Sequence, residues 1–179
     1  MTGIRQLRVL IWRQTQYLTG FYGGQTHGAT PLAPAPETEP VRLTGRRPWG
    51  QRVKVAVRSE DFLVVARELH GQGKRVAVLN MANARRAGGG VESGAGAQEE
   101  NLFRRSDSWR ALSAQHAQHY PIPPDACLLS KGVTIFRGPE SAGYPMEAPF
   151  QVDVITNAVP AYPPWTDGTD TPGGGTRTT

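Results

Sequence analysis

The chain has 179 residues, 38% of them hydrophobic, so it can bury the core of one domain of ordinary size and still carry a tail. It contains no run of about 18 apolar residues and no secretory signal, so we expect neither a membrane-spanning helix nor export. The basic excess lies in residues 1–58, which favours a polyanionic partner, although a solvated basic face explains such a bias better by itself.

An amphipathic helix is predicted in "GIRQLRVLIWRQTQYLTG", residues 3–20. Arg8 is expected to lie away from its apolar stripe, which consists of Ile4, Leu7, Leu10 and Ile11. We interpret this helix as a cap on the domain. A mitochondrial presequence is the alternative, because no acidic residue precedes Glu37. The segment "TPLAPAPETEP" (30–40) is too rich in proline for regular structure and should be an extended loop.

A β-α-β unit with parallel strands is predicted next. Its strands are "VKVAV" (53–57), which is rich in β-branched residues, and "RVAVLN" (75–80), which is typical of a central strand. Ser59 can cap the helix between them, and Gly71 ends it. The apolar face of this helix consists of Phe62, Val65, Ala66 and Leu69. Three further short strands are expected, at 126–130, 133–136 and 152–156.

Five glycines follow the carboxyl end of the 75–80 strand, where open α/β sheets bind ligands: Gly88, Gly89, Gly90, Gly94 and Gly96. Without side chains they let backbone N–H groups approach a phosphate or a sugar. A flexible surface loop explains the glycines alone better. Gln98, Glu99 and Glu100 then begin a helix, so the loop leads directly to a carboxylate pair. A carboxylate buried against a sugar could act as a general acid, whereas many helices simply begin with acidic residues.

The glycines and the carboxylates together carry a resemblance to a known family. The spacing of Gly88-Gly89-Gly90 and Gln98-Glu99-Glu100 resembles the GGG and QEE signature of poly(ADP-ribose) glycohydrolases. "VAVLNMANARRAGGG" and "VTIFRGPESAGYPMEAPFQVDVITNAVP" are similar to blocks of the microbial type. The resemblance implies an α/β fold, a macrodomain-like three-layer α/β/α sandwich with a mixed sheet and an N-terminal capping helix. The implied substrate is poly(ADP-ribose), a polyanion.

The resemblance also implies the roles of single residues. Glu100 would be the catalytic acid that protonates the leaving oxygen of the ribose–ribose bond and then activates water as a carboxylate. Glu99 would hydrogen-bond ribose hydroxyls, and Gly88, Gly89 and Gly90 would let the backbone close on the ribose and the diphosphate. Asn83 and Gln98 would fix the ribose or the loop. By themselves, Asn83 is more often a turn residue and Gln98 a plain helix-start residue.

The carboxyl-terminal part departs from the family pattern. After "DVITNAVPAYPP" the family continues with a helix, a core strand and a second glycine-rich loop, whereas this chain has a polar, linker-like segment. We therefore expect a fold whose C-terminal part is missing. The expected divisions are residues 1–40 (N-terminal helix and Pro-rich loop), 41–160 (incomplete glycohydrolase-like domain) and 161–179 (disordered tail).

The predicted function is hydrolysis of poly(ADP-ribose), free or on ADP-ribosylated proteins, without a cofactor. The alternative is a non-catalytic ADP-ribose-binding protein or an inactive truncated remnant, and a nucleic-acid module has least support. His116 and His119 lack a third ligand, so no metal site is predicted. Arg85 and Arg86 could meet phosphate or remain exposed loop charges. The lone Cys127, expected to be buried, indicates a reducing compartment and a cytoplasmic location, with mitochondrial and nuclear locations as alternatives.

Overall fold

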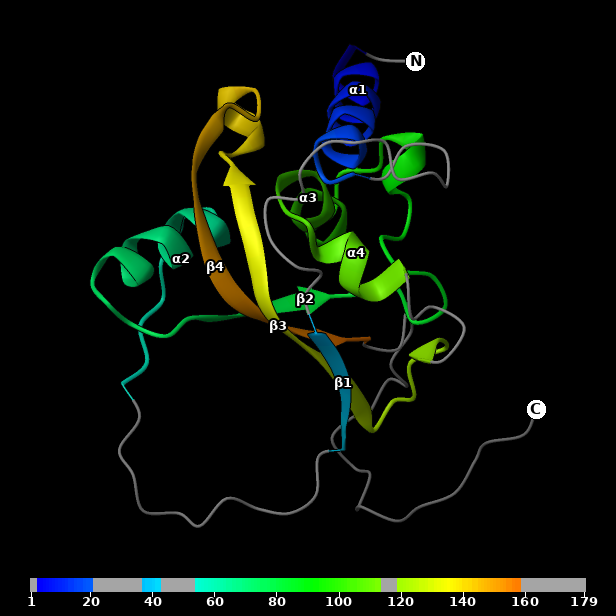
Figure 1. Cartoon of the computed structure of the whole chain (residues 1–179), viewed down its shortest axis with the longest axis vertical. Helices are drawn as coiled ribbons and strands as arrows, with labels where there is room; N and C mark the ends of the chain where they lie inside the picture. Colours follow the sequence, from blue (N-terminus) through cyan, green and yellow to red (C-terminus); the bar gives the residue numbers. More distant parts are fainter. Residues whose placement is uncertain (1–2, 21–36, 43–53, 114–118, 159–179) are drawn as a thin grey trace, which may run out of the picture.

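A mixed four-stranded sheet organises the chain. The computed structural model describes residues 3–20, 37–42, 54–113 and 119–158. The strand order is β1-β3-β4-β2 (Figure 1). The β1–β3 and β3–β4 pairs are antiparallel, and β2 runs parallel to β4. The bounds of the strands are β1 Glu37–Arg42, β2 Ala77–Met81, β3 Ala126–Arg137 and β4 Met146–Asn157. The predicted α/β class with a mixed sheet is thus confirmed.

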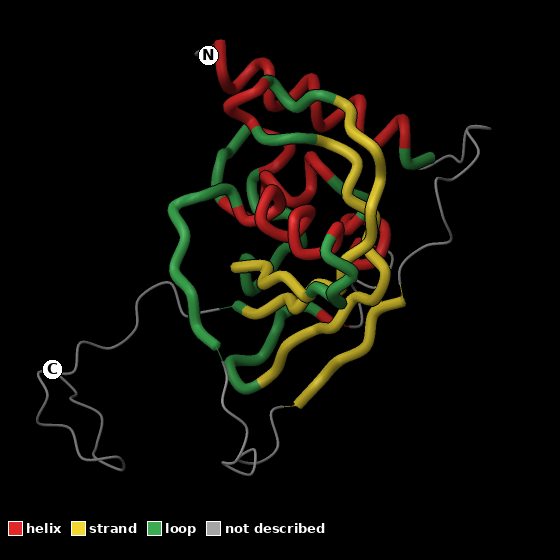
Figure 2. Tube along the Cα trace, turned by 90° about the vertical axis from the view of Figure 1, so that its left-hand side faces the viewer, coloured by secondary structure: helices red, strands yellow, loops and turns green. Residues whose placement is uncertain are grey.

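The described helices gather on one side of the strands, which curve around them (Figure 2). Side chains from α2 and α3 pack in a single buried cluster with one face of the sheet, and α1 contacts α3 from outside. The α-helices are α1 Gly3–Leu18, α2 Phe62–Gly71, α3 Gln98–Arg105 and α4 Ser108–Ser113, and the 3-10 helices are η1 Val91–Ser93 and η2 Glu140–Ala142.

Two hydrophobic clusters form the core. The first joins α2, α3 and the sheet, and consists of Leu63, Ala66, Val78, Leu102, Val133, Ile135, Phe150, Val152 and Val154. The second joins α1, α3 and α4 to β3, and contains Trp12, Val91, Phe103, Trp109, Leu112, Ile122, Leu128 and Ala158. Val91 and Phe103 of this second cluster lie next to Gly88, so the cluster packs against the glycine loop of the predicted site.

The three short strands expected between residues 126 and 156 are two long ones. The segments 126–130 and 133–136 are halves of β3, and the register with β4 shifts between Ser130 and Val133. Gly132, with a φ of +68°, lies at this irregularity, where its positive φ carries no strain. The glycine marks a bulge within one strand, and not a turn between two.

The prediction of a strand at residues 53–57 is wrong. Residues 54–57 have no regular structure, and Val55 and Val57 are 84% and 96% exposed. The parallel partner of β2 is β4. The N-cap of α2 is Asp61, whose Oδ1 accepts from the N–H groups at 63 and 64, and not Ser59. β-Branched residues favour a strand only where a neighbouring strand supplies hydrogen bonds and packing, and here none does among the described residues.

Helix α1 is confirmed, but its most buried residues are not those of the predicted apolar stripe. Leu10 is 61% exposed, whereas Trp12 and Thr15 are buried and the Arg8 carbonyl accepts from Arg104 of α3. Thr15 Oγ1 donates to the Arg104 carbonyl at 2.6 Å. The surface under α1 consists of backbone carbonyls and charged groups as well as apolar side chains, so a mixed helix face fits it. The expected capping role is consistent with the contacts of α1 to η1 and α3.

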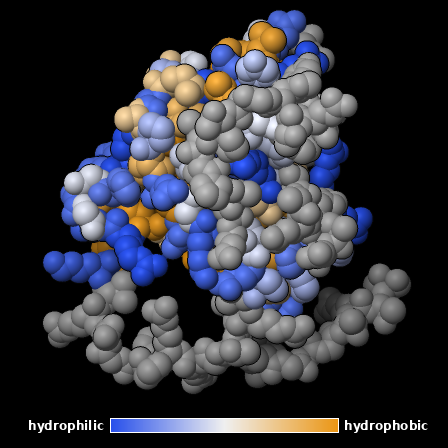
Figure 3. All heavy atoms as spheres, viewed as in Figure 1, coloured by the Kyte–Doolittle hydropathy of each residue, from blue (hydrophilic) through white to orange (hydrophobic). Residues whose placement is uncertain are grey.

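Apolar side chains also reach the surface. Figure 3 shows hydrophobic and hydrophilic residues intermixed over the described part of one face. Leu79 and Met81 of β2 and Ile155 of β4 are 53%, 59% and 38% exposed, on the sheet face away from the helices. None of the described helices is long and apolar enough to cross a membrane. Cys127 is buried, as predicted.

Three predictions fall on residues that the structure does not describe. The expected tail at residues 161–179 lies outside the described residues, as do most of the Pro-rich segment 30–40 and His116. The last residues of the Pro-rich segment are described, and they form part of β1 and not an extended loop. Pro40 is tolerated there because β1 is an edge strand of the sheet.

Candidate active site

The carboxylate pair lies at the first turn of α3, immediately after the glycine loop. Ala97 is the N-cap, and no side-chain cap accepts from the first N–H groups of this helix. Glu99 and Glu100 follow and are only 3% and 7% exposed. The partial positive charge of a helix N-terminus favours carboxylates at this position and offsets part of the cost of burying them. The predicted meeting of loop and carboxylates is confirmed.

Glu99 ties two parts of the loop together. Its Oε2 accepts from the Asn83 N–H at 2.8 Å, and its Oε1 accepts from the Gly88 N–H at 3.0 Å. Burial raises the pKa of Glu99 above its ordinary value, and the two N–H donors lower it in part. Glu99 therefore holds the entry of the loop against α3. Its predicted contact with ribose hydroxyls stays a prediction.

Glu100 has one oxygen held and one without a partner. Its Oε1 accepts from the Gly90 N–H at 2.9 Å. Its Oε2 is buried and has no hydrogen-bond partner among the described residues. A buried carboxylate oxygen without a partner is costly for a purely structural residue, because the lost hydration is not replaced. This arrangement is what a group reserved for a ligand or a proton transfer would show.

The close approach of the loop to the carboxylates explains two of the glycines. A Cβ on Gly89, whose φ is +50°, would lie 2.6 Å from Glu100 Oε1 and 3.2 Å from Glu99 Oε2. A Cβ on Gly88, whose φ is +75°, would lie 2.7 Å from the Phe103 ring. Only glycine combines these dihedral angles with this proximity. The loop thus packs closely against the carboxylates at Gly88 and Gly89.

Gly94 and Gly96 do not line this place. A Cβ on Gly94 would lie 2.7 Å from the Arg5 carbonyl oxygen, and a Cβ on Gly96 would overlap the Arg8 guanidinium. Both glycines accommodate α1 at close range. The expectation that they open the backbone to a ligand is therefore corrected: their space is taken by the N-terminal helix.

Asn83 and Gln98 hold backbone in place. Asn83 Oδ1 accepts from the N–H groups of Arg85 and Arg86 at 2.9 and 3.1 Å, which stabilises the turn before the glycines. Gln98 Nε2 donates to the Leu79 carbonyl at 2.7 Å, and its Oε1 accepts from the Met81 N–H at 2.9 Å. Asn83 thus fixes the loop, which is one of the two roles predicted for it, whereas Gln98 holds the end of β2.

The basic loop residues and possible metal ligands add little to the site. The Arg86 guanidinium pairs with Glu92 at 3.0 Å, and both side chains are mostly exposed. Such exposed pairs contribute little to stability, so the guanidinium stays available to an anion. The described residues contain no group of three His, Cys, Asp or Glu side chains placed to hold a metal ion.

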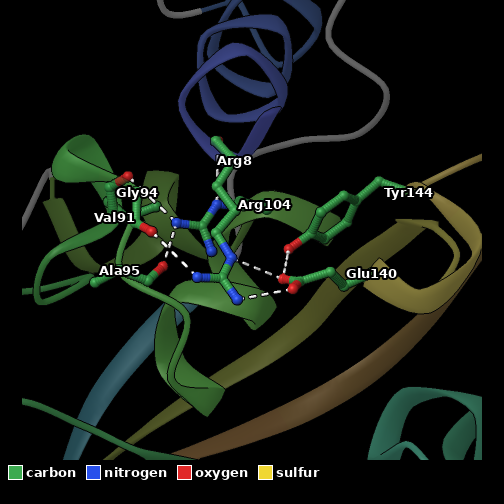
Figure 4. A network of polar contacts seen from close by, with 7 residues as sticks. All are labelled: Arg8, Val91, Gly94, Ala95, Arg104, Glu140 and Tyr144. Carbon is green, nitrogen blue, oxygen red and sulfur yellow. Dashed lines mark hydrogen bonds and ion pairs between the residues drawn. The ribbon is translucent and has the colours of Figure 1, made fainter. Parts of the chain in front are cut away.

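Sequence reasoning missed the network behind the loop (Figure 4). Arg104, fully buried on α3, donates to the carbonyls of Val91 and Ala95. Arg8 of α1 makes two hydrogen bonds to Glu140, which also accepts from the Tyr144 hydroxyl. Arginine is rarely buried, so composition alone hides such residues. The one available signal is spacing, because residue 104 follows Glu100 by one helical turn and shares its face.

The comparisons agree with this site. A family model described as "Microbial-type PARG, catalytic domain", where PARG is poly(ADP-ribose) glycohydrolase, matches residues 24–138. A solved structure of this enzyme from Thermomonospora curvata has a TM-score of 0.69 and 31% identity, over 87% of this chain and 65% of that chain. Another, bound to the inhibitor ADP-HPD, has a TM-score of 0.65 and 33% identity, over 87% and 63% of the two chains.

A search of curated proteins found no match. The chain spans 63–65% of the length of the solved Thermomonospora curvata structures. Over that length it shares their fold and 31–33% of the aligned residues, which supports the macrodomain-like architecture that the signature implied. With the family model matching most of its residues as well, the chain belongs to the family of microbial-type poly(ADP-ribose) glycohydrolase catalytic domains.

Proposed function

We propose that the chain hydrolyses the ribose–ribose O-glycosidic bond of poly(ADP-ribose) and releases ADP-ribose, with Glu100 as the catalytic acid. The observation that carries the proposal is Glu100 Oε2, which is buried and has no hydrogen-bond partner among the described residues. The Gly90 N–H holds the other oxygen and so fixes the direction of the carboxylate. A solved relative bound to ADP-HPD supports an ADP-ribose-like ligand.

The reaction has two proton transfers at one carboxyl group. Protonated Glu100 gives its proton to the leaving glycosidic oxygen as the bond from the anomeric carbon to that oxygen breaks. The ionised carboxylate then accepts a proton from the water that attacks the anomeric carbon. The products are a shortened polymer with a free hydroxyl group and one ADP-ribose. Because Glu99 is held by Asn83 and Gly88, it positions the loop and does not flank the bond as a second glycosidase carboxylate would.

The loop backbone is suited to a polyanionic sugar. Gly88 packs against Phe103 and Gly89 against Glu100, so the loop backbone lies close to the carboxylates that would meet the ribose. The Arg86 side chain is 61% exposed next to this loop and can meet a phosphate. We propose that the substrate includes polymer attached to ADP-ribosylated proteins, because the charge and the sugar are the same in both.

The test compares Glu100→Gln with a matched control. Glutamine keeps the size of the side chain and an oxygen for the Gly90 N–H, but it cannot exchange a proton. Glu92→Gln removes the same charge from an exposed residue of the same loop. We expect wild type and Glu92→Gln to release ADP-ribose at equal rates and Glu100→Gln to be slower by about 10³-fold. Calorimetry should show that Glu100→Gln still binds ADP-ribose.

Two results would contradict the proposal. If Glu100→Gln releases ADP-ribose as fast as wild type, another residue supplies the proton. If wild type binds ADP-ribose but releases none from the polymer, the chain is a binding protein and not a hydrolase. Binding of DNA that ADP-ribose does not displace, and that falls with added salt, would favour a nucleic-acid module.

A further inference from the structure

We propose that Arg104 is a positioning residue, which holds the glycine loop in the geometry where the Gly90 N–H donates to Glu100. Arg104 lies one helical turn after Glu100, so both side chains leave the same face of α3. Glu100 binds the loop at Gly90, and Arg104 binds it at the residues that follow. The catalytic consequence rests on the proposed function, whereas the geometric claim does not.

The contacts of Arg104 converge on the exit of the loop (Figure 4). Its Nη2 donates to the Ala95 carbonyl at 2.5 Å and more weakly to the Val91 carbonyl at 3.4 Å. The loop closes on itself between these residues, because the N–H groups of Ser93 and Ala95 donate to the Gly90 carbonyl at 3.1 Å. A displacement of Val91 or Ala95 is therefore passed to Gly90.

The other side of the guanidinium reaches α1. Arg104 Nε donates to the Arg8 carbonyl at 3.2 Å, so Arg104 joins α3, the loop and α1. Arg8 continues the chain of contacts through its ion pair with Glu140 at 2.7 Å and through the Gly94 carbonyl at 3.4 Å. The loop is held between two helices, and Arg104 is the side chain that contacts all three elements.

Burial makes these contacts necessary. Arg104 is 0% exposed, and burial lowers the pKa of its guanidinium below the ordinary value. Its hydrogen bonds go to the carbonyls of Arg8, Val91 and Ala95, and the Tyr144 hydroxyl also interacts with it, whereas none of its described hydrogen bonds goes to a carboxylate. A buried cation without hydrogen-bond acceptors costs several kcal/mol. The carbonyls of Val91 and Ala95 therefore supply part of the compensation of this charge, which couples the position of the loop to the stability of α3.

The next residue provides a matched control. Arg105 lies on the same helix and is 1% exposed, but its side chain points toward α2 and β3. Its Nη1 pairs with Asp61 at 2.7 Å, and its Nε donates to the Arg137 carbonyl at 3.2 Å. Arg105→Lys thus disturbs a buried guanidinium of equal burial that does not touch the loop. A role in stability alone predicts the same result for both positions.

The experiment measures hydrogen exchange of the Gly90 amide by NMR in the full chain, for wild type, Arg104→Lys and Arg105→Lys. We expect Gly90 to exchange at least about 10-fold faster in Arg104→Lys than in Arg105→Lys, since a lost hydrogen bond of about 1.4 kcal/mol changes an equilibrium tenfold. Arg104→Gln, which keeps a donor without the buried charge, replaces the lysine variant if that variant does not fold. In the hydrolysis assay we expect Arg104→Lys to lose kcat about 10-fold with little change in KM.

The outcomes separate the two proposals. Equal Gly90 exchange in Arg104→Lys and Arg105→Lys would overturn the positioning role, whatever the activity. Equal kcat in these two variants, with active wild type, would overturn its catalytic consequence. If wild type releases no ADP-ribose but Gly90 loses its protection only in Arg104→Lys, the proposed function fails and the positioning role stands.

Discussion

Gly89 lies so close to Glu100 that a single methyl group at residue 89 would come 2.6 Å from Glu100 Oε1. The contact is tighter than real Cβ atoms tolerate, and the neighbour that would have to move is the carboxylate itself. The glycines and the glutamates of the signature are therefore parts of one packed unit. A substitution at Gly89 therefore displaces the Glu100 carboxylate, and a substitution at Glu100 alters the packing of Gly89.

We expect Gly89→Ala to lower hydrolysis by about 10²-fold, because the new methyl group displaces the carboxylate from its productive position. The positive φ adds a stability cost of about 1 kcal/mol. Gly73→Ala is the matched control, since Gly73 has a φ of +75° and a methyl group there would meet nothing within 4 Å among the described residues. Activity and thermal unfolding of both variants check this. Equal activity of the two would show that the approach of loop and carboxylate is not needed.

Gln98→Glu tests the junction between α3 and β2. The carboxylate can still accept from the Met81 N–H, but it has no donor for the Leu79 carbonyl and repels it. We expect a loss of about 1–3 kcal/mol in the free energy of unfolding, measured with urea. Gln6→Glu, at an exposed residue of α1, is the control and should change stability by less than about 0.5 kcal/mol. A Gln98→Glu variant as stable as wild type would contradict this role.

Asp107 gives stability a pH dependence. It is 1% exposed, and burial raises the pKa of its carboxyl group from 3.8 to about 6. A raised pKa means that the folded state holds the proton more tightly, so the stabilisation by the protonated form is lost as pH rises from about 4 to about 6. Asp107→Asn keeps an acceptor for the Thr134 N–H and cannot titrate.

We therefore expect the free energy of unfolding of Asp107→Asn minus that of wild type to increase from pH 4 to pH 7, by at most about 3 kcal/mol. Urea unfolding at the two pH values measures the difference. Hydrolysis at pH 7 should be unchanged, because Asp107 does not touch the glycine loop in the described structure. A stability difference that is the same at both pH values would show that Asp107 does not titrate in this range.

Glu140→Gln tests the attachment of α1. Arg8 binds both carboxylate oxygens of Glu140, at 3.0 and 2.7 Å, with both side chains about one fifth exposed. We expect Glu140→Gln to lower the free energy of unfolding by about 1 kcal/mol. This loss should be smaller in 1 M salt, because ions screen the partly exposed pair. Glu60→Gln, which disturbs an exposed pair with Arg58, should cost less. The rate of proteolytic cleavage within α1, measured at low and high salt for both variants, checks the prediction. Equal cleavage of Glu140→Gln and wild type would contradict the prediction.

Local sequence was enough to locate the site. Gly88 to Gly90 and Glu99 to Glu100 are separated by few residues, so the strand, loop and helix that join them dictate their meeting. The same holds for the strand at 75–80, which appears as β2, and for the start of α3 at Gln98. These features depend on neighbours in the chain, which a single sequence displays directly.

Contacts between distant segments could not be predicted in the same way. The segment 53–57 has strand composition but no strand beside it in the described part of the structure. Arg8 looks like a surface residue until Glu140, which is 132 positions away, folds against it. Arg104 looks exposed until α1 covers it. In each case the decisive partner is set by tertiary packing, which overrides local preference.

The amide of Gln98 makes the two hydrogen bonds that one residue of a parallel neighbour would make opposite Asn80. A side chain thus takes the place of a strand at the outer edge of β2. A further strand that paired with β2 along this edge could not make the hydrogen bonds opposite Asn80, because the Gln98 amide already makes them. Such a strand would have to end before Met81. The Gln98 amide in this way ends the edge of β2 next to the start of α3, where Glu99 and Glu100 lie.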